Sequence, residues 1–185
     1  MSGLRHLDSP LTDGTVALRE WTDADVEAMT APLNDAEIAR WTRVPSPYTR
    51  ADAEDFLERM EARRATGEEL ALAIVSAADG ELLGSMSVRV SSRENGRGEL
   101  GYLVFERARG QGVATRAARL LARYAFERLD LRRVEILAAV GNAASQRVAE
   151  KAGFTREGVL RSYMDNRGER LDMVAWSLLP ADLGD

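Results

Sequence analysis

The chain has 185 residues, of which 45% are hydrophobic and 30% charged, and its formal net charge is −5. This length and composition predict one globular domain with a sizeable core and exclude a disordered chain. The negative charge argues against a nucleic-acid binder, because such proteins usually carry a basic surface. The chain has no cysteine and one histidine, His6, which excludes disulfides, thiolate nucleophiles, and metal sites built from cysteines or several histidines.

The N-terminal residues lack the features of a targeting segment. Residues 1–9 contain neither a basic cluster nor an apolar stretch, so the sequence predicts no signal peptide. No run approaches the roughly 18 apolar residues that are needed to cross a bilayer. We therefore expect a cytoplasmic protein that binds neither membranes nor nucleic acid.

In the first third of the chain, the sequence predicts one strand followed by helices. Residues 15–21 alternate apolar and polar side chains, which is typical of a half-buried strand. Thr22 begins a capping-box-like pattern, which predicts a short helix after it. A second short helix is predicted at residues 38–41. Thr49 can cap a longer helix, which Gly67 ends.

The rest of the chain reads mainly as strands, with two more helices. The predicted strands are residues 70–75, 83–90, 99–105, 133–140, 154–160 and 171–179, and the predicted helices are residues 112–129 and 142–152. This order predicts an α+β fold with a mostly antiparallel sheet and one βαβ unit over residues 99–140. We expect a single domain over residues 1–185, with its core at about residues 15–179.

The most informative segment is residues 106–116, which lie between a predicted strand and the longest predicted helix. A helix start offers unpaired backbone N–H groups and the positive end of the helix dipole. Gly110 and Gly112 carry no Cβ, so an anion can approach the main chain closely. Arg109 adds a cation and Thr115 a hydroxyl group. Together these residues predict a cradle for a diphosphate.

The surrounding sequence indicates which diphosphate. The Gly-Lys-Ser/Thr of a nucleotide P-loop and the third glycine of a dinucleotide fingerprint are both missing. Residues 109–114 resemble the Q/R-x-x-G-x-G/A signature of the GNAT N-acetyltransferases, and residues 142–154 resemble their N-x-x-S…E-K-x-G-F segment. Residues 157–161 continue as in the RimJ/RimL-like branch, which acetylates the N-termini of ribosomal proteins. The resemblance runs over about residues 15–179.

The resemblance implies a GNAT fold, in which a twisted central sheet has a V-shaped splay and flanking helices. It also implies acetyl-CoA as co-substrate, with its pyrophosphate in the glycine loop and its pantetheine beside the strand before it. The main chain around Leu103 and Val104 would bind the pantetheine, and Asn142 and Ser145 would contact the cofactor. The expected loop contacts are Arg109, Gly110, Gln111, Gly112, Val113, Ala114 and Thr115.

Two residues are candidates for proton transfer to and from the reacting groups. Glu99 is the candidate base for the amine, since partial burial would raise its pKa; the alternative is a surface glutamate or an ion pair with Arg97 or Arg133. Ser145 is the candidate acid for the leaving thiolate. Its alternative is a structural role behind an N-cap at Asn142. Many GNAT enzymes use a tyrosine later in this helix, where this chain has residues 149–152, and Tyr163 is the fallback.

The acceptor is less defined than the donor. Trp41, Tyr48 and Tyr102 are candidates for the acceptor pocket, although aromatic residues more often belong to the core. The acceptor amine is either a protein N-terminus or a small molecule, attacking the thioester directly in a ternary complex. Two alternatives stay open: a CoA-binding sensor module without catalysis, and use of another thioester such as succinyl-CoA. The sequence also leaves open whether the chain forms a homodimer.

Overall fold

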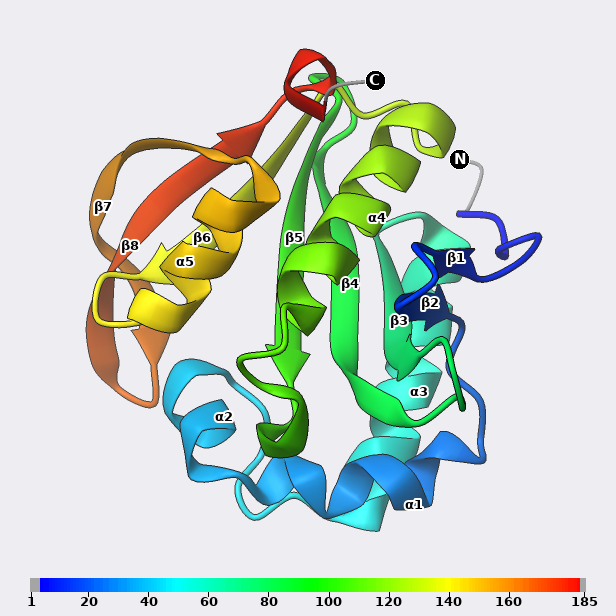
Figure 1. Cartoon of the computed structure of the whole chain (residues 1–185). Coiled ribbons are helices and arrows are strands. Elements are labelled where there is room, and N and C mark those ends of the chain that lie inside the picture. The colour runs from blue at the N-terminus through cyan, green and yellow to red at the C-terminus, as the bar shows by residue number, and fades with distance from the viewer. Residues whose placement is uncertain (1–3, 184–185) are drawn as a thin grey trace.

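The computed structural model describes residues 4–183, so both ends of the predicted 1–185 domain lie just outside the described part. One eight-stranded sheet runs through the molecule in the order β1-β2-β3-β4-β5-β6-β8-β7 (Figure 1). The strands are β1 Leu11–Thr12, β2 Val16–Arg19, β3 Glu69–Ser76, β4 Leu82–Ser92, β5 Arg97–Val104, β6 Arg133–Ala139, β7 Thr155–Asn166 and β8 Glu169–Leu178. The helices are α1 Asp25–Thr30, α2 Ala36–Trp41, α3 Arg50–Thr66, α4 Val113–Arg128 and α5 Ala143–Ala152.

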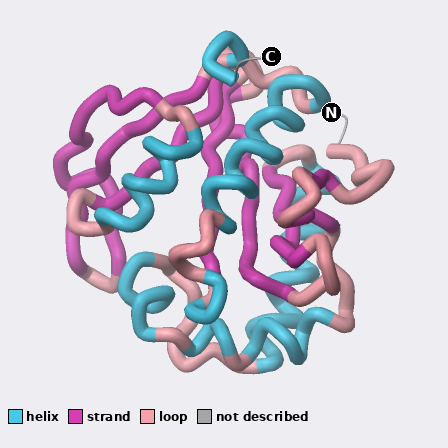
Figure 2. The backbone as a smooth tube through the Cα atoms, viewed as in Figure 1, coloured by secondary structure: helices cyan, strands magenta, loops and turns pink. Residues whose placement is uncertain are grey.

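Local signals set the ends of the helices, as the sequence predicts. Thr49 caps α3 in a full capping box with Asp52, and Gly67 ends the helix in the left-handed conformation with φ 79°. Gly153 ends α5 in the same way, and Asn142 caps its start. In Figure 2 the helices lie on both faces of the sheet and are joined by short loops.

The sheet is mostly antiparallel and splays at its centre. The pairing of β5 with β6 is parallel and extends only from Arg97↔Arg133 to Glu99↔Glu135. Beyond Glu99 the two strands separate, with β4 still paired along β5 and β8 along β6. The predicted βαβ unit and V-shaped splay are therefore confirmed.

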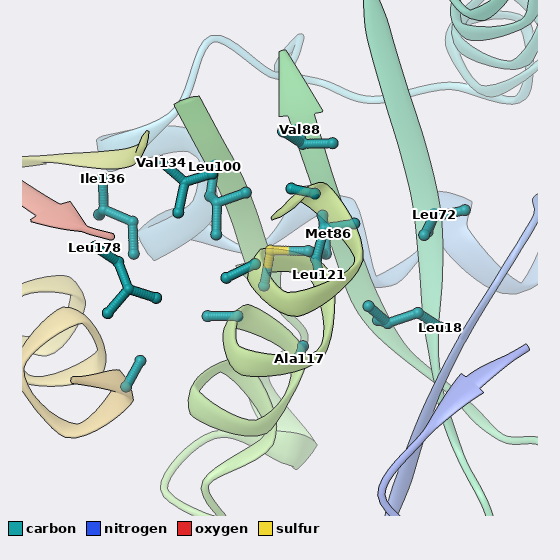
Figure 3. Packing of buried hydrophobic residues seen from close by; sticks show 14 of the residues in the cluster. Leu18, Leu72, Met86, Val88, Leu100, Ala117, Leu121, Val134, Ile136 and Leu178 are labelled. Atoms are coloured by element: carbon teal, nitrogen blue, oxygen red, sulfur yellow. The ribbon is translucent and has the colours of Figure 1, made fainter. Parts of the chain in front are cut away.

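The two faces of the sheet hold separate hydrophobic clusters. In the first cluster, Ala117 and Leu121 of α4 pack against Met86, Leu100 and Ile136 of the sheet (Figure 3). The second cluster lies on the opposite face, beneath α1 and α3. Among the described residues, no helix is both long and apolar enough to cross a membrane.

The strands extend further than the sequence predicts. β4 and β5 take up both ends of the stretch expected as a polar loop at residues 91–98 and leave residues 93–96 as the turn, because a hairpin keeps pairing where only one face is covered. β7 continues to Asn166 instead of ending near residue 160, with a register shift between Leu160 and Met164. β7 is mostly exposed, so alternation of apolar residues gives little sign of its length.

Candidate active site

The glycine loop leaves the start of α4 open. Gly110 and Gly112 have φ values of 75° and 78°, and a Cβ added at either would meet nothing within 4 Å. The N-cap position of α4, Gly112, makes no side-chain cap hydrogen bond. Within residues 4–183, no backbone or side-chain acceptor bonds the N–H groups of residues 110–115. Because the protein's own atoms leave these donors unsatisfied, the loop fits a diphosphate.

Arg109 ties this loop to the N-terminal helices. Its guanidinium donates to Asp35 Oδ1 at 2.6 Å and to the Val104 carbonyl at 3.1 Å. Asp35 also accepts from the Ile38 N–H as the N-cap of α2. The hydrogen bond from Arg109 lowers the pKa of Asp35 below its usual value. The cation predicted from the sequence is thus present at the loop, but it is shared with a carboxylate.

The backbone of β5 presents every second amide to the splay. Phe105 N donates to Leu83 O of β4 at 2.9 Å, and the same register pairs Leu103 with Ser85. Since amide directions alternate along a strand, the Leu103 N–H points toward β4, and those of Tyr102 and Val104 point toward the gap. The expected main-chain contact thus falls on Val104, whereas Leu103 contributes its side chain to the cleft wall.

A cleft of about 740 Å³ occupies the splay. It is bounded by α2, β5, the glycine loop, the start of α4, β6, α5 and β8. Gln111 does not line it, and its side chain instead donates to the Arg107 carbonyl. The predicted residues that line the cleft are Trp41, Glu99, Tyr102, Leu103, Val104, Arg109, Gly110, Gly112, Val113, Ala114, Thr115, Asn142 and Ser145.

Two hydroxyl groups meet within the cleft. Tyr102 Oη of β5 lies 2.9 Å from Ser145 Oγ of α5 and 3.1 Å from the Ser145 carbonyl oxygen. Asn142 caps α5 through the Ser145 N–H at 3.0 Å, so its structural role and its place in the cleft coexist. Burial raises the pKa of Tyr102 to about 12. Tyr163, in contrast, is 53% exposed on β7 and is not part of the cleft wall.

Sequence reasoning placed Tyr102 in the cleft but missed its contact with Ser145. The two residues are 43 positions apart, and no local pattern connects them. A strand and a helix from opposite sides of the splay bring them together. The structure thus adds a hydroxyl partner to the candidate acid.

Glu99 lies where the two strands begin to separate. Its carboxylate lines the cleft and accepts from Arg89 of the neighbouring strand β4 at 2.7 Å. Glu99 is therefore ion-paired, as the alternative reading of the sequence expected, but with Arg89, whereas Arg133 binds Glu135 and Glu157. Among the described residues, the second carboxylate oxygen of Glu99 has no protein hydrogen-bond donor.

The three aromatic candidates for the acceptor pocket do not lie together. Trp41 faces the cleft and donates from Nε1 to Glu37 at 2.9 Å. Tyr48 does not line the cleft, because its ring packs into the second hydrophobic cluster and borders a separate cavity of about 270 Å³. Leu103 and Arg43 line both spaces. No sequence pattern distinguishes these positions, since all three are aromatic residues in or near predicted helices or strands.

Comparison with known proteins assigns the family. The family model described as "Acetyltransferase (GNAT) domain" matches residues 15–155. The chain is 33% identical over 165 residues to YdaF of Bacillus subtilis (strain 168), a proposed ribosomal N-acetyltransferase, covering 89% of this chain and 90% of the relative. A solved structure described as a probable acetyltransferase is 29% identical, with a TM-score of 0.84, over 94% of this chain and 98% of the other.

Structures of named ribosomal-protein acetyltransferases have the same fold. RimJ of Mycobacterium smegmatis, solved with a CoA disulfide, superposes with a TM-score of 0.85 at 22% identity and covers 96% of this chain and 88% of its own. The resemblance seen in the glycine loop and in residues 142–154 is therefore confirmed. This chain belongs to the GNAT acetyltransferase family, in its RimJ/RimL-like branch, and is an acyl-CoA-dependent N-acetyltransferase.

Proposed function

We propose that this enzyme transfers an acetyl group from acetyl-CoA to the α-amine of a protein N-terminus by direct attack in a ternary complex. The donor is supported by the open amides of residues 110–115 and by the free edge of β5. The acceptor class is supported by YdaF, a proposed ribosomal N-acetyltransferase, and by RimL, described as an α-N-protein acetyltransferase of ribosomal L7/L12.

The observation that carries this proposal is that the cleft passes between β5 and β6 and is lined from both faces of the sheet. Leu100 and Tyr102 belong to the face that α4 covers, whereas Leu103 belongs to the opposite face, and all three line the cleft. A donor bound beside α4 can therefore meet an acceptor that enters from the side of α2 and β8. Holding both reactants in one opening supplies much of the rate acceleration.

The donor site uses main-chain groups of this chain. The N–H groups of residues 110–115 bind the pyrophosphate, and the Val104 N–H, on the open edge of β5, binds the pantetheine. Gly110 and Gly112 keep the loop free of side chains that would block the anion. When bound, acetyl-CoA supplies an activated acyl thioester. Asn142, the cap of α5, lines the same cleft and would contact the bound cofactor.

The proposed catalytic residues lie on the cleft wall. Glu99 accepts a proton from the acceptor ammonium, directly or through water, because only the neutral amine has a lone pair. Ser145 donates a hydrogen bond or proton to the sulfur of the leaving group, and Tyr102 holds the Ser145 hydroxyl from behind. The chain has no cysteine, so an acyl-cysteine intermediate is not part of this mechanism.

An acceptor panel tests this function. Release of free thiol from acetyl-CoA is followed with short peptides that have a free N-terminus, and the same peptides with an acetylated N-terminus are the control. We expect turnover with free N-termini only. CoA binding without thiol release from any amine would instead favour the sensor module. A parallel series with succinyl-CoA tests the choice of donor.

A further inference from the structure

Two cations of α5 face the cleft without a counter-ion. Arg147 and Lys151 line the cleft and are exposed to solvent. Among the described residues, neither side chain makes an ion pair within 4.0 Å or a hydrogen bond. The two arginines near the start of α4 differ in this respect, since Arg109 pairs with Asp35 and Arg116 with Asp13. The uncompensated positive charge on this side of the cleft therefore lies on α5.

The spacing of these two cations is set by their positions on α5. Residues four apart on a helix are neighbours on one face, so Arg147 and Lys151 project side by side. Their stripe on α5 also includes Ala144 and Val148, and both of these line the cleft. The pair can therefore act together on one ligand group.

Their distance from the glycine loop is also constrained. Arg119 lies one helical turn after Thr115 on α4, a rise of about 5.4 Å. The Arg119 guanidinium donates to the Lys151 carbonyl at 2.6 Å and holds α5 against α4 at this level. The backbone of Lys151 thus lies about one turn of α4 beyond the diphosphate cradle, and the side chains of Arg147 and Lys151 line the same cleft as the loop. A ribose separates two phosphate groups by a comparable distance.

The charge of the ligand requires such a pair. Coenzyme A carries a diphosphate and, on the ribose, a 3′-phosphomonoester that is close to a dianion at neutral pH. A protein of net charge −5 repels such a polyanion at long range unless local cations compensate. The amides of residues 110–115 account for the diphosphate only and leave the 3′-phosphate without a partner.

We propose that Arg147 and Lys151 form a subsite for the 3′-phosphate of the CoA ribose and thereby distinguish CoA from its dephosphorylated form. This inference rests on the proposed CoA site and goes beyond it, because it assigns a second anion to a different helix. The subsite contributes to affinity and donor choice and takes no part in acyl transfer.

Calorimetric titration tests the subsite without using catalysis. CoA and 3′-dephospho-CoA are titrated into the full chain and into the Arg147→Gln, Lys151→Gln and double variants. We expect each single substitution to weaken CoA binding about three- to tenfold, as for exposed charge-assisted contacts, and to leave dephospho-CoA binding unchanged. In the double variant the two ligands should bind with nearly equal affinity.

The matched control is Arg123→Gln on the outer face of α4, where Arg123 lies 4.0 Å from Glu127. It removes one positive charge far from the cleft and should leave both affinities unchanged. Added salt should reduce the difference in binding affinity between CoA and 3′-dephospho-CoA in the wild-type protein. Equal affinity of wild-type protein for both ligands, or an equal loss for both in the variants, would overturn the subsite while leaving the CoA site intact. Failure of both ligands to bind the wild-type protein would instead refute the proposed function itself.

Discussion

The contact between Tyr102 and Ser145 gives each residue a function that its type alone does not assign. A serine hydroxyl is a weak acid, but a second hydroxyl at 2.9 Å fixes its orientation. Burial raises the pKa of Tyr102 to about 12, so this side chain stays protonated and remains a donor at any working pH. The pair can therefore present one oriented O–H group to the leaving sulfur.

Substitution of the pair should be non-additive. We expect Ser145→Ala and Tyr102→Phe each to lower kcat about tenfold or more and to change CoA affinity much less, because each removes part of one proton donor. The double variant should then lose little more than Ser145→Ala alone. Steady-state kinetics and CoA titration measure both quantities. Independent, multiplying effects would mean that Tyr102 does not act through Ser145.

Glu99 provides the second prediction at the residue scale. Glu99→Gln keeps the shape of the side chain but removes the proton acceptor, so kcat should fall by about 10²-fold or more with no change in CoA affinity. The control is Glu135→Gln, which changes the register neighbour of Glu99 on β6, a residue bound to Arg133 and absent from the cleft wall. Full activity of the Glu99 variant would indicate that water alone accepts the proton.

At the scale of elements, the glycine loop depends on how α4 begins. The helix has no side-chain cap, and nothing within residues 4–183 accepts from its first N–H groups, so these groups are open to solvent or a ligand. Arg109 and Asp35 connect the same loop to α2, which carries Trp41 on the acceptor side of the cleft. Ligand binding at the glycine loop and the position of α2 are therefore coupled through the Arg109–Asp35 ion pair.

A pair of substitutions of equal size isolates the charge effect at this loop. Gly112 has φ 78°, and both Asn and Asp tolerate this region better than other non-glycine residues. We expect Gly112→Asp to weaken CoA binding at least about tenfold more than Gly112→Asn, because only the carboxylate repels the diphosphate. Titration of both variants with CoA measures this ratio. Equal losses of CoA affinity in the two variants would indicate that backbone strain, and not charge, causes the effect.

At the scale of the whole molecule, buried tyrosines couple stability to alkaline pH. Tyr48 and Tyr102 lie with different clusters on opposite faces of the sheet, and burial raises the pKa of each to about 12. Their ordinary pKa is 10.0, so the unfolded chain loses these protons first as the pH rises. The stabilisation is complete below pH 10 and is lost between about pH 10 and 12. Lys151 is the only lysine, so few other groups titrate in this window.

The free energy of unfolding should therefore fall steeply above pH 10. Removing the two hydroxyl groups in a Tyr48→Phe and Tyr102→Phe double variant should flatten this fall, because neither state then releases those protons. Tyr163→Phe, at an exposed position on β7, should leave the slope as in the wild type. Denaturant unfolding at pH 8, 10 and 11 measures the slopes. A slope unchanged in the double variant would refute this linkage.

The sequence by itself determined the features that depend on neighbouring residues. The capping box at Thr49, the glycine that ends α3, and the glycine loop before α4 each act within a few positions of the chain, so their physical consequences are local. The order of strands and helices followed from hydrophobic periodicity. The family resemblance then supplied the splayed sheet, which the structure confirms.

Only the tertiary structure decided which distant groups meet. The partner of Glu99 is Arg89, that of Arg109 is Asp35, and that of Ser145 is Tyr102, and none of these pairs is encoded by local spacing. Tyr48 joins a hydrophobic cluster because packing, rather than residue type, decides which side of the sheet an aromatic ring occupies. Sheet register and helix placement set these contacts, and both depend on the burial of surface from the whole chain at once.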